Sequence, residues 1–371
     1  MASDKFKIKY PAIHSGTDKS EIFFCKGTPD LTSVFNPGKS DEQRRFFVTD
    51  ATVASLDCMK EFLAEFDDDV CGRDQLLILG SGEPYKTLES VLSIVTKALE
   101  AGFTRKDLFV GIGGGVICDI TAFAASIFKR GAAVQFVPTT LLAMVDASIG
   151  GKTGCDFNNY KNMIGTFFPA QKLYYWPEFV QYLPYNQYRS GLAEALKTGI
   201  LFSQELYDLF KNESEKIKNR DKEILEKIIK ECVKAKAGVV EQDLTEKGIR
   251  AYLNLGHTFG HALESIAGLG AMTHGDAVAW GIGRAVTLSY KKEYCRESYK
   301  NEIYEILENY GWETNPVPAI VRGGGIGERF LNVMHKDKKN LAEKIRIIIS
   351  KGIGDTVIEE VSDAEILSVL K

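Results

Sequence analysis

The chain has 371 residues, enough for two or three domains and a sizeable buried core. Hydrophobic residues make up 44% and charged residues 26%, which excludes a disordered, collagen-like or coiled-coil protein. The formal net charge of −4 argues against general nucleic-acid binding, which requires an excess of Lys and Arg for phosphate contacts.

The composition also bears on the compartment. No apolar run approaches the roughly 18 residues that span a bilayer, and residues 1–7 contain no apolar signal-peptide core. The seven cysteines form no CxxC pair, which favours reduced thiols. We therefore expect a cytoplasmic protein that binds neither membrane nor nucleic acid.

Strand and helix signals alternate through the first 180 residues. Four segments read as strands: 44–50, which ends in a polar turn, 75–79, 108–112 and 134–137. After Gln75, the run 75–79 is continuously apolar, which suits a parallel strand buried on both faces. Apolar residues recur at helical spacing over 88–99, and Gly102 follows as a stop signal. This alternation predicts βαβ units and a mostly parallel sheet.

The pattern changes near residue 180, where prolines 177 and 184 interrupt the chain. From there to about residue 310 the apolar spacing is helical, for example over 224–233. Residues 345–349 resemble a strand, but the sequence shows no partner for it. We expect an N-terminal, Rossmann-like α/β domain over 1–180 and a C-terminal, mainly helical domain over 181–371.

A glycine-rich turn occupies residues 111–119, between a predicted strand and a predicted helix. Glycines allow close backbone approach and a helix N-terminus offers free N–H groups, so this turn can cradle a pyrophosphate. Val116 breaks the GxGxxG spacing, which leaves a tight structural turn as the alternative. Residues 150–154 resemble a P-loop only superficially, because they lack its spacing.

Three of the five histidines, His257, His261 and His274, lie within 18 residues. His257 and His261 are four residues apart and share one face of a helix. Together with a carboxylate, such imidazoles suit Zn²⁺ or Fe²⁺. Thr258 and Phe259 occupy the place of the glutamate in HExxH, which argues against a zinc protease. The alternative is that these histidines are satisfied core or surface residues.

Glu194 is a candidate fourth member of this group. It lies in an otherwise apolar helical stretch, with Lys197 three residues further on. An exposed ion pair of small energetic value is the alternative explanation. Spacing alone does not select Glu194 over other carboxylates.

Five motifs, taken together and in order, resemble the 3-dehydroquinate synthases of the sugar phosphate cyclase superfamily. They occupy residues 113–119, 137–143, 145–154, 161–165 and 254–261. The similarity extends from about residue 75 to 285 with a weaker match at 337–339, and the first 45 residues show no clear match.

The resemblance implies an enzyme of the shikimate pathway, which leads to chorismate and the aromatic amino acids. The implied reaction converts 3-deoxy-arabino-heptulosonate 7-phosphate to 3-dehydroquinate and phosphate. It combines transient oxidation by NAD, phosphate elimination, reduction and an intramolecular aldol closure. The resemblance further implies one divalent metal, zinc or cobalt, a small sugar phosphate substrate and a homodimer.

The same resemblance assigns residues. It gives Glu194, His257 and His274 as metal ligands and His261 as a catalytic histidine. The implied NAD-binding residues are Asp50, Glu83, Lys86, Gly114, Gly115, Asp119, Thr139, Thr140 and Lys161. The implied substrate-site residues are Arg130, Asp146, Lys152, Asn162, Lys197, Lys236, Arg250, Asn254 and Lys338, with Lys339 as the alternative to Lys338.

Arg250, Asn254 and His257 are spaced so that one helix would aim all three the same way. A surface arginine is the alternative for Arg250. Cys118 stands where the family usually has glycine, and we expect it to crowd the glycine turn. Two other functions remain open: another sugar phosphate cyclase, of the 2-deoxy-scyllo-inosose synthase type, and a metal- and NAD-dependent polyol dehydrogenase.

Overall fold

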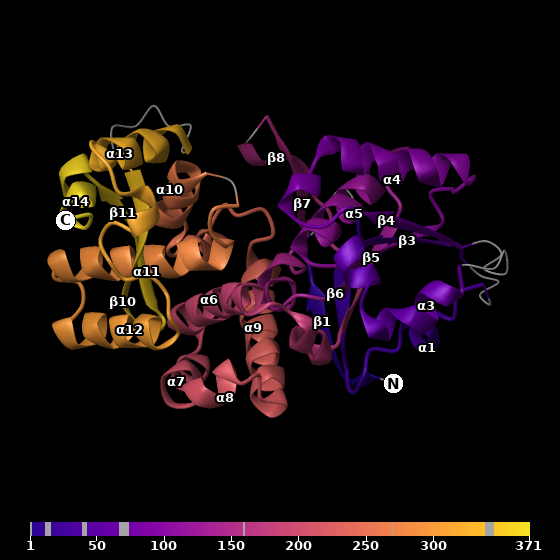
Figure 1. Ribbon diagram of the computed structural model, residues 1–371, viewed down its shortest axis with the longest axis horizontal. Coiled ribbons are helices and arrows are strands. Elements are labelled where there is room, and N and C mark those ends of the chain that lie inside the picture. Colours follow the sequence, from indigo (N-terminus) through magenta and orange to yellow (C-terminus); the bar gives the residue numbers. More distant parts are fainter. Residues whose placement is uncertain are drawn as a thin grey trace. The chain divides into compact units, whose positions relative to one another are not determined.

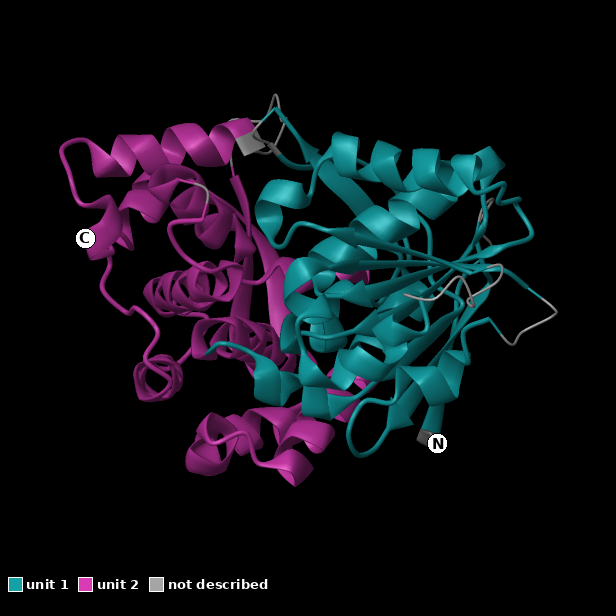
Figure 2. Ribbon diagram, turned by 45° about the vertical axis from the view of Figure 1, so that its right-hand side comes forward, with its two compact units in different colours: residues 1–184, 236–246 teal, residues 185–235, 247–371 magenta. Residues whose placement is uncertain are grey.

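The computed structural model describes residues 2–11, 16–38, 43–66, 74–158, 160–268, 270–337 and 345–371. They form two compact units, shown in different colours in Figure 2. The first unit contains residues 1–184 and 236–246, and the second contains 185–235 and 247–371. A single boundary near residue 180 does not describe this division, because 236–246 packs with the first unit. Lys338 and Lys339 lie outside the described residues.

The first unit is built on a seven-stranded sheet with the order β1-β2-β9-β6-β5-β3-β4 (Figure 1). β1 and β2 pair antiparallel, and all the other neighbours pair parallel. The strands are β1 (Ala2–Lys9), β2 (Lys19–Cys25), β3 (Arg45–Asp50), β4 (Gln75–Leu79), β5 (Leu108–Gly113), β6 (Ala133–Pro138) and β9 (Lys172–Tyr175).

The four strands predicted from sequence are confirmed as β3, β4, β5 and β6. One detail of that prediction is wrong, because β4 is not buried on both faces. It lies at the edge of the sheet, and Ile78 is 48% exposed. The sequence also gave no indication of the β1–β2 hairpin, whose residues alternate in burial along β2 as in a sheet with one solvated face.

Aromatic side chains pack on both faces of β3, an inner strand between β5 and the edge strand β4. Phe46 and Phe47 are adjacent, so their side chains point to opposite faces. The Phe46 ring lies 5.4 Å from Phe103, and the Phe47 ring lies 5.1 Å from Phe62. Edge-to-face contacts of this kind on both sides hold the strand rigidly, and with it the loops at its ends.

Gly102 ends the helix α4 as predicted. It adopts a positive φ of +71°, and the Phe103 N–H donates to the carbonyl of Ala98 at 2.9 Å. The other elements of this unit are α1 (Leu31–Phe35), α2 (Ala51–Ala54), η1 (Asp57–Met59), α3 (Lys60–Ala64), η3 (Glu83–Tyr85), α4 (Leu88–Glu100), α5 (Gly115–Ile127), η4 (Phe128–Arg130), η5 (Ala143–Ala147), β7 (Lys152–Phe157), β8 (Tyr160–Phe167) and η6 (Pro177–Tyr182).

The second unit is mainly helical, as predicted. The strand expected near residue 345 exists, and its partner is the segment that follows it, paired antiparallel. The elements are α6 (Tyr185–Phe202), α7 (Gln204–Asn212), α8 (Ser214–Lys218), α9 (Lys222–Gln242, which continues into the first unit), η7 (Ile249–Asn254), α10 (His257–Ala267), α11 (His274–Lys291), α12 (Glu297–Asn309), η8 (Ala319–Val321), α13 (Ile326–Asp337), β10 (Ile345–Gly352), β11 (Asp355–Val361) and α14 (Asp363–Ser368).

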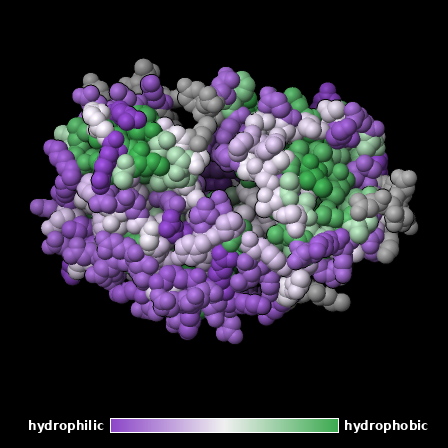
Figure 3. Space-filling model, viewed as in Figure 1, coloured by the Kyte–Doolittle hydropathy of each residue, from purple (hydrophilic) through white to green (hydrophobic). Residues whose placement is uncertain are grey.

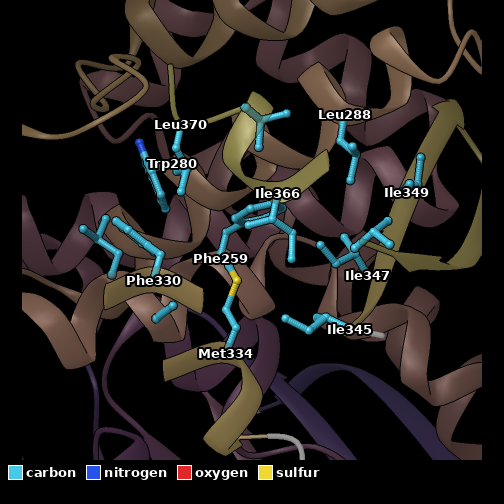
Figure 4. Packing of buried hydrophobic residues seen from close by; sticks show 14 of the residues in the cluster. Phe259, Trp280, Leu288, Phe330, Met334, Ile345, Ile347, Ile349, Ile366 and Leu370 are labelled. Atoms are coloured by element: carbon cyan, nitrogen blue, oxygen red, sulfur yellow. The ribbon is translucent and has the colours of Figure 1, made fainter. Parts of the chain in front are cut away.

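One apolar core joins α10 and α11 to the C-terminal elements (Figure 4). The Trp280 ring of α11 lies 6.4 Å from Phe259 of α10 and 5.5 Å from Phe330 of α13. Ile347 of β10 packs in the same cluster. This core orients the two helices that carry the clustered histidines.

No helix in the described ranges is long and apolar enough to cross a membrane. Hydrophilic residues cover α11 and α12 on the face seen in Figure 3.

Candidate metal centre and cofactor site

A glycine brings α6 and α11 into backbone contact. A Cβ at Gly275 would lie 2.6 Å from the carbonyl carbon of Ser190 and closer still to its oxygen, so only glycine fits. The Gly275 N–H donates to the Ser190 hydroxyl at 3.0 Å. Glu194, one turn after Ser190, is thereby placed beside His274, which precedes Gly275.

Glycines also bring α10 and α11 together. A Cβ at Gly281 would lie 2.9 Å from the carbonyl carbon of Gly256 and closer to its oxygen, and a Cβ at Gly260 would lie 2.9 Å from the Ala277 oxygen. These contacts place His257 and His261 of α10 next to the start of α11.

Four side chains predicted from sequence meet here. Oε1 of Glu194 lies 3.4 Å from Nε2 of His257 and 3.5 Å from Nε2 of His274. The imidazole rings of His257 and His261 are 5.3 Å apart, and those of His261 and His274 are 5.8 Å apart. The second unit therefore assembles the histidine cluster with the carboxylate that spacing alone did not select.

The outer nitrogens of two imidazoles are already engaged. Nδ1–H of His257 donates to the carbonyl of Leu255 at 3.2 Å, and Nδ1–H of His274 donates to Oε2 of Glu264 at 3.1 Å. These bonds fix the tautomer that leaves Nε2 free to bind a metal. Sequence reasoning missed Glu264, although it follows His257 by seven residues and His261 by three, on the same helix face.

The carboxylate of Glu194 is buried and pairs with the ammonium of Lys197. The alternative of an exposed ion pair is therefore wrong. Burial raises the pKa of Glu194, but Lys197, His257 and His274 outweigh it and hold that pKa well below its usual range. Burial alone would lower the pKa of His274, but hydrogen bonding to Glu194 and Glu264 raises it to about 9.

The cluster fits a divalent cation. Both Glu194 oxygens are buried, and the described groups that face them are the Lys197 ammonium and the Nε2 atoms of His257 and His274. Ligand atoms of His257, His261 and His274 lie within 4.8 Å of one another. Imidazole nitrogens and one carboxylate oxygen are the donor set that zinc and cobalt accept.

Arg250 and Asn254 do not share a helix with His257, so that prediction is wrong. They lie on η7, and Gly256, at a φ of +79°, interrupts the helical conformation before α10 begins. Arg250 is 1% exposed, which also excludes a surface arginine.

Most predicted cofactor residues follow the carboxyl ends of four neighbouring strands. In parallel sheets these ends meet at one edge, where nucleotide cofactors bind. Asp50 ends β3, and the other residues follow β4, β5 and β6: Glu83, Lys86, Gly114, Gly115, Asp119, Thr139 and Thr140. Lys161 lies instead on the hairpin strand β8, 3.9 Å from the Glu83 carboxylate.

The glycine-rich turn has the predicted strand–turn–helix form. Gly114 is the N-cap of α5, and no side chain caps that helix. The Thr139 N–H donates to the Gly113 carbonyl at 2.9 Å and joins the turn to the end of β6. The Cys118 thiol is buried, 3.9 Å from the same carbonyl.

A buried lysine connects the predicted cofactor and substrate residues of the first unit. Nζ of Lys86 lies 2.7 Å from the Asp119 carboxylate and donates to the Asn162 amide oxygen at 2.5 Å. Burial opposes the charge of Lys86, yet Asp119 and Glu83 raise its pKa. Burial raises the pKa of Asp119 against the pull of Lys86.

A second polar group lies beside η5, a π-helix, an element frequent at functional sites. Nζ of Lys236 donates to the Asp146 carboxylate at 2.5 Å and to the Asp146 carbonyl at 2.6 Å. Lys152 forms an ion pair with Glu246, a residue that sequence reasoning did not single out.

Arg130 lies far from the other predicted substrate and cofactor residues of the first unit. It ends η4, which follows the carboxyl end of α5, while the glycine turn lies at the other end of that helix. The 13 residues of α5 separate the two ends by about 20 Å. Arg130 thus lies near the amino ends of the strands, on the side of the sheet opposite the glycine turn.

Comparison with known proteins identifies the family of this chain. Residues 76–190 match the family model of the 3-dehydroquinate synthase N-terminal part, and residues 191–340 match that of the C-terminal part. The chain belongs to the 3-dehydroquinate synthase family. The 3-dehydroquinate synthase of Acidithiobacillus ferrooxidans is 38% identical over 327 residues, which cover 87% of each chain. That of Wolinella succinogenes is 41% identical over 291 residues, covering 78% of this chain and 81% of the relative.

Solved structures confirm the fold class of this 3-dehydroquinate synthase family member. A 2-epi-5-epi-valiolone synthase from Streptomyces hygroscopicus subsp. jinggangensis 5008, with NAD⁺ and Zn²⁺ bound, superposes with a TM-score of 0.83 at 24% identity over 98% of each chain. A 2-deoxy-scyllo-inosose synthase in complex with carbaglucose-6-phosphate, NAD⁺ and Co²⁺ gives 0.82 at 23% identity over 99% of each. A probable glycerol dehydrogenase from Sinorhizobium meliloti 1021 gives 0.66 at 13% identity over 94% of each.

Proposed function

We propose that this protein is a 3-dehydroquinate synthase that converts 3-deoxy-arabino-heptulosonate 7-phosphate into 3-dehydroquinate and phosphate. The observation that carries this assignment is the buried Glu194 carboxylate facing His257 and His274, in a chain whose relatives of that name are 38% identical over 87% of its length.

Glu194, His257 and His274 hold one divalent ion, zinc or cobalt. Such an ion acts as a Lewis acid that lowers the pKa of a bound hydroxyl. Glu264 and the Leu255 carbonyl keep the two imidazoles in the ligating tautomer. His261, whose ring lies beside both, accepts and returns a proton from the substrate.

NAD binds at the carboxyl ends of β3, β4, β5 and β6. Bound there, NAD would supply reversible hydride transfer without net consumption. The N-terminus of α5, bounded by Gly114 and Gly115, receives the pyrophosphate. Asp50, Thr139 and Thr140 lie at the ends of the flanking strands and orient the cofactor.

The remaining polar residues bind the substrate anions. Arg250 supplies a buried guanidinium whose planar fork suits a carboxylate, and Asn254 follows it on η7. Lys152, which is 50% exposed, exchanges Glu246 for the substrate phosphate. Asp146, Asn162, Lys197 and Lys236 hold the hydroxyl groups. We leave Arg130 out of this assignment because it lies near the amino ends of the strands, away from the glycine turn.

Phosphate release from the heptulosonate phosphate tests the activity, with sedoheptulose 7-phosphate and glucose 6-phosphate assayed in parallel. Release from the first substrate alone, at substoichiometric NAD and without net NADH, is the expected result. Release from either of the other two would instead indicate another sugar phosphate cyclase. Steady accumulation of NADH would indicate a polyol dehydrogenase.

Variants separate the metal ligands from the proton-transfer residue. Glu194→Ala, His257→Ala and His274→Ala should lose metal and activity together. His261→Ala should retain the metal and lose activity. Full zinc occupancy in the first three variants, or metal loss in His261→Ala, would contradict the assignment.

We also propose that the enzyme is a cytoplasmic homodimer. The six cysteines in the described residues form no disulfide with one another, as is usual in a reducing compartment. Light scattering of the purified protein tests the dimer, and a monomeric mass would exclude it.

A further inference from the structure

A cavity of about 370 Å³ lies in the second unit, between α11, α12 and the residues around Ser368. Arg284, Thr287 and Lys291 line it from α11, and Lys300 and Tyr304 line it from α12. No Asp or Glu side chain is among its lining residues, which also include Lys371, the last residue of this sequence. The volume falls in the range of small-molecule sites and far exceeds the roughly 30 Å³ of one water.

Arg284 is the unusual member of this lining. It is 2% exposed, and no described carboxylate forms an ion pair with it. Its terminal nitrogens donate to the Val369 carbonyl at 3.2 Å, the Thr314 carbonyl at 2.7 Å and the Tyr304 hydroxyl at 2.5 Å. Its Nε–H is buried and has no acceptor among the residues described.

A purely structural role explains part of this. The guanidinium ties two backbone carbonyls to α11 and lies 5.6 Å from the Trp280 ring. Neutral acceptors, however, do not balance a buried positive charge, and buried charges in proteins are normally paired. Burial accordingly lowers the pKa of Arg284 despite the nearby Tyr304 and Glu313.

Two lysines add further positive charge to the lining of the cavity. Nζ of Lys291 donates to the Ser368 carbonyl at 2.6 Å, a neutral partner. Lys300 lies 3.5 Å from Glu297, a carboxylate that is 61% exposed and outside the lining. The hydroxyls of Thr287 and Tyr304, 2.7 Å apart, add further polar groups to the wall.

We propose that this cavity binds a small organic anion through a phosphate or carboxylate group, at a site that uses none of the metal, cofactor or substrate residues assigned above. Such a ligand would give Arg284 the close anionic partner that no described side chain supplies. It would also use the two lysines and fit the size of the cavity. Guanidinium and ammonium groups bind the negatively charged oxygens of phosphates and carboxylates alike. The site therefore selects an anionic oxygen group of either kind.

The test measures binding of inorganic phosphate and of malonate to the full-length protein by calorimetry, at constant ionic strength in chloride. The double variant Lys291→Gln/Lys300→Gln removes two positive charges without disturbing the tethers of Arg284. The control Lys222→Gln/Lys336→Gln removes the same charge from exposed positions of the second unit. Phosphate bound at the substrate site contributes equally to all three proteins.

We expect an additional equivalent of phosphate or malonate in the wild type, weakened at least tenfold in the first variant and retained in the control. Whichever anion binds more tightly identifies the ligand as a phosphate or a carboxylate. Equal weakening in both variants, or no difference between the first variant and the wild type, would overturn the proposal. Crystals soaked in tungstate provide a second measurement, since density elsewhere but not beside Arg284 would also overturn it.

Discussion

Replacing Gly275 by alanine should disturb the metal centre although glycine bears no functional group. The new Cβ would lie 2.6 Å from the Ser190 carbonyl carbon, whereas real Cβ atoms essentially never come within 3.0 Å of another heavy atom. The clash is with backbone, so no side chain can move aside, and α6 and α11 must separate by about 1 Å. Glu194 and His274 lie on those two helices, so the separation moves them apart.

The magnitude follows from that strain. Overpacking of a close contact costs about 1–3 kcal/mol. Metal sites tolerate ligand displacements of only about 0.2 Å. To bind the metal, the variant must therefore bring α6 and α11 back together against the clash of the new Cβ with the Ser190 backbone. The strain then appears in the binding free energy, and 1–3 kcal/mol corresponds to zinc affinity lowered by about 5-fold to 150-fold.

Chelator competition measures the zinc affinity, and circular dichroism shows whether the variant is folded. The control is Gly238→Ala in α9, where no atom lies within 4 Å of the added Cβ. It should retain zinc affinity and gain about 0.5–1 kcal/mol of stability from the better helix former. If folded Gly275→Ala bound zinc as tightly as the wild type, the close approach of α6 and α11 would not be what positions the ligands.

Three further predictions concern single side chains. Glu264→Gln should weaken zinc binding by about 10-fold to 100-fold in chelator competition, because it removes the charge that orients His274; unchanged affinity would contradict this. Arg250→Lys should raise KM about tenfold or more with unchanged metal content, because an ammonium does not reproduce the planar fork. Hydrogen bonding to Lys292 and to the Ser362 backbone lowers the pKa of Glu365 to about 2; its stabilisation is therefore complete above pH 4.5 and lost as the pH falls toward 2. Glu365→Gln should melt below the wild type at pH 7, and that difference should vanish in this acidic range.

The sequence predicted the parts of the fold that depend on local pattern. Short, mainly apolar segments marked β3, β5 and β6, because strands covered on both faces need apolar side chains on each of them. The same rule overstated the burial of β4, since the run 75–79 does not reveal that the strand has a neighbour on one side only. The partner of β10 was missed because β11 mixes charged and apolar residues.

The candidate site was predictable to the extent that its residues lie close in sequence. The close spacing of His257, His261 and His274 predicted a metal or catalytic site. Glu194 lies more than 60 positions earlier and was selected by resemblance to the family. The expectation that Arg250 and His257 share one helix failed, because Gly256 ends the preceding turn and α10 begins only after it. Spacing also gave no warning that α5 carries Arg130 away from the glycine turn.

The distances within the proposed metal centre are set by residues that cannot bind a metal. His257 and His261 share one helix, so α10 alone fixes their relation, but the distance from His257 to Glu194 depends on how closely separate helices approach. Gly275 and Gly281 set that approach by admitting a backbone carbonyl where any side chain would stand. A chain with all four polar side chains and a larger residue at either glycine would therefore keep the motif and lose the geometry of the proposed metal centre.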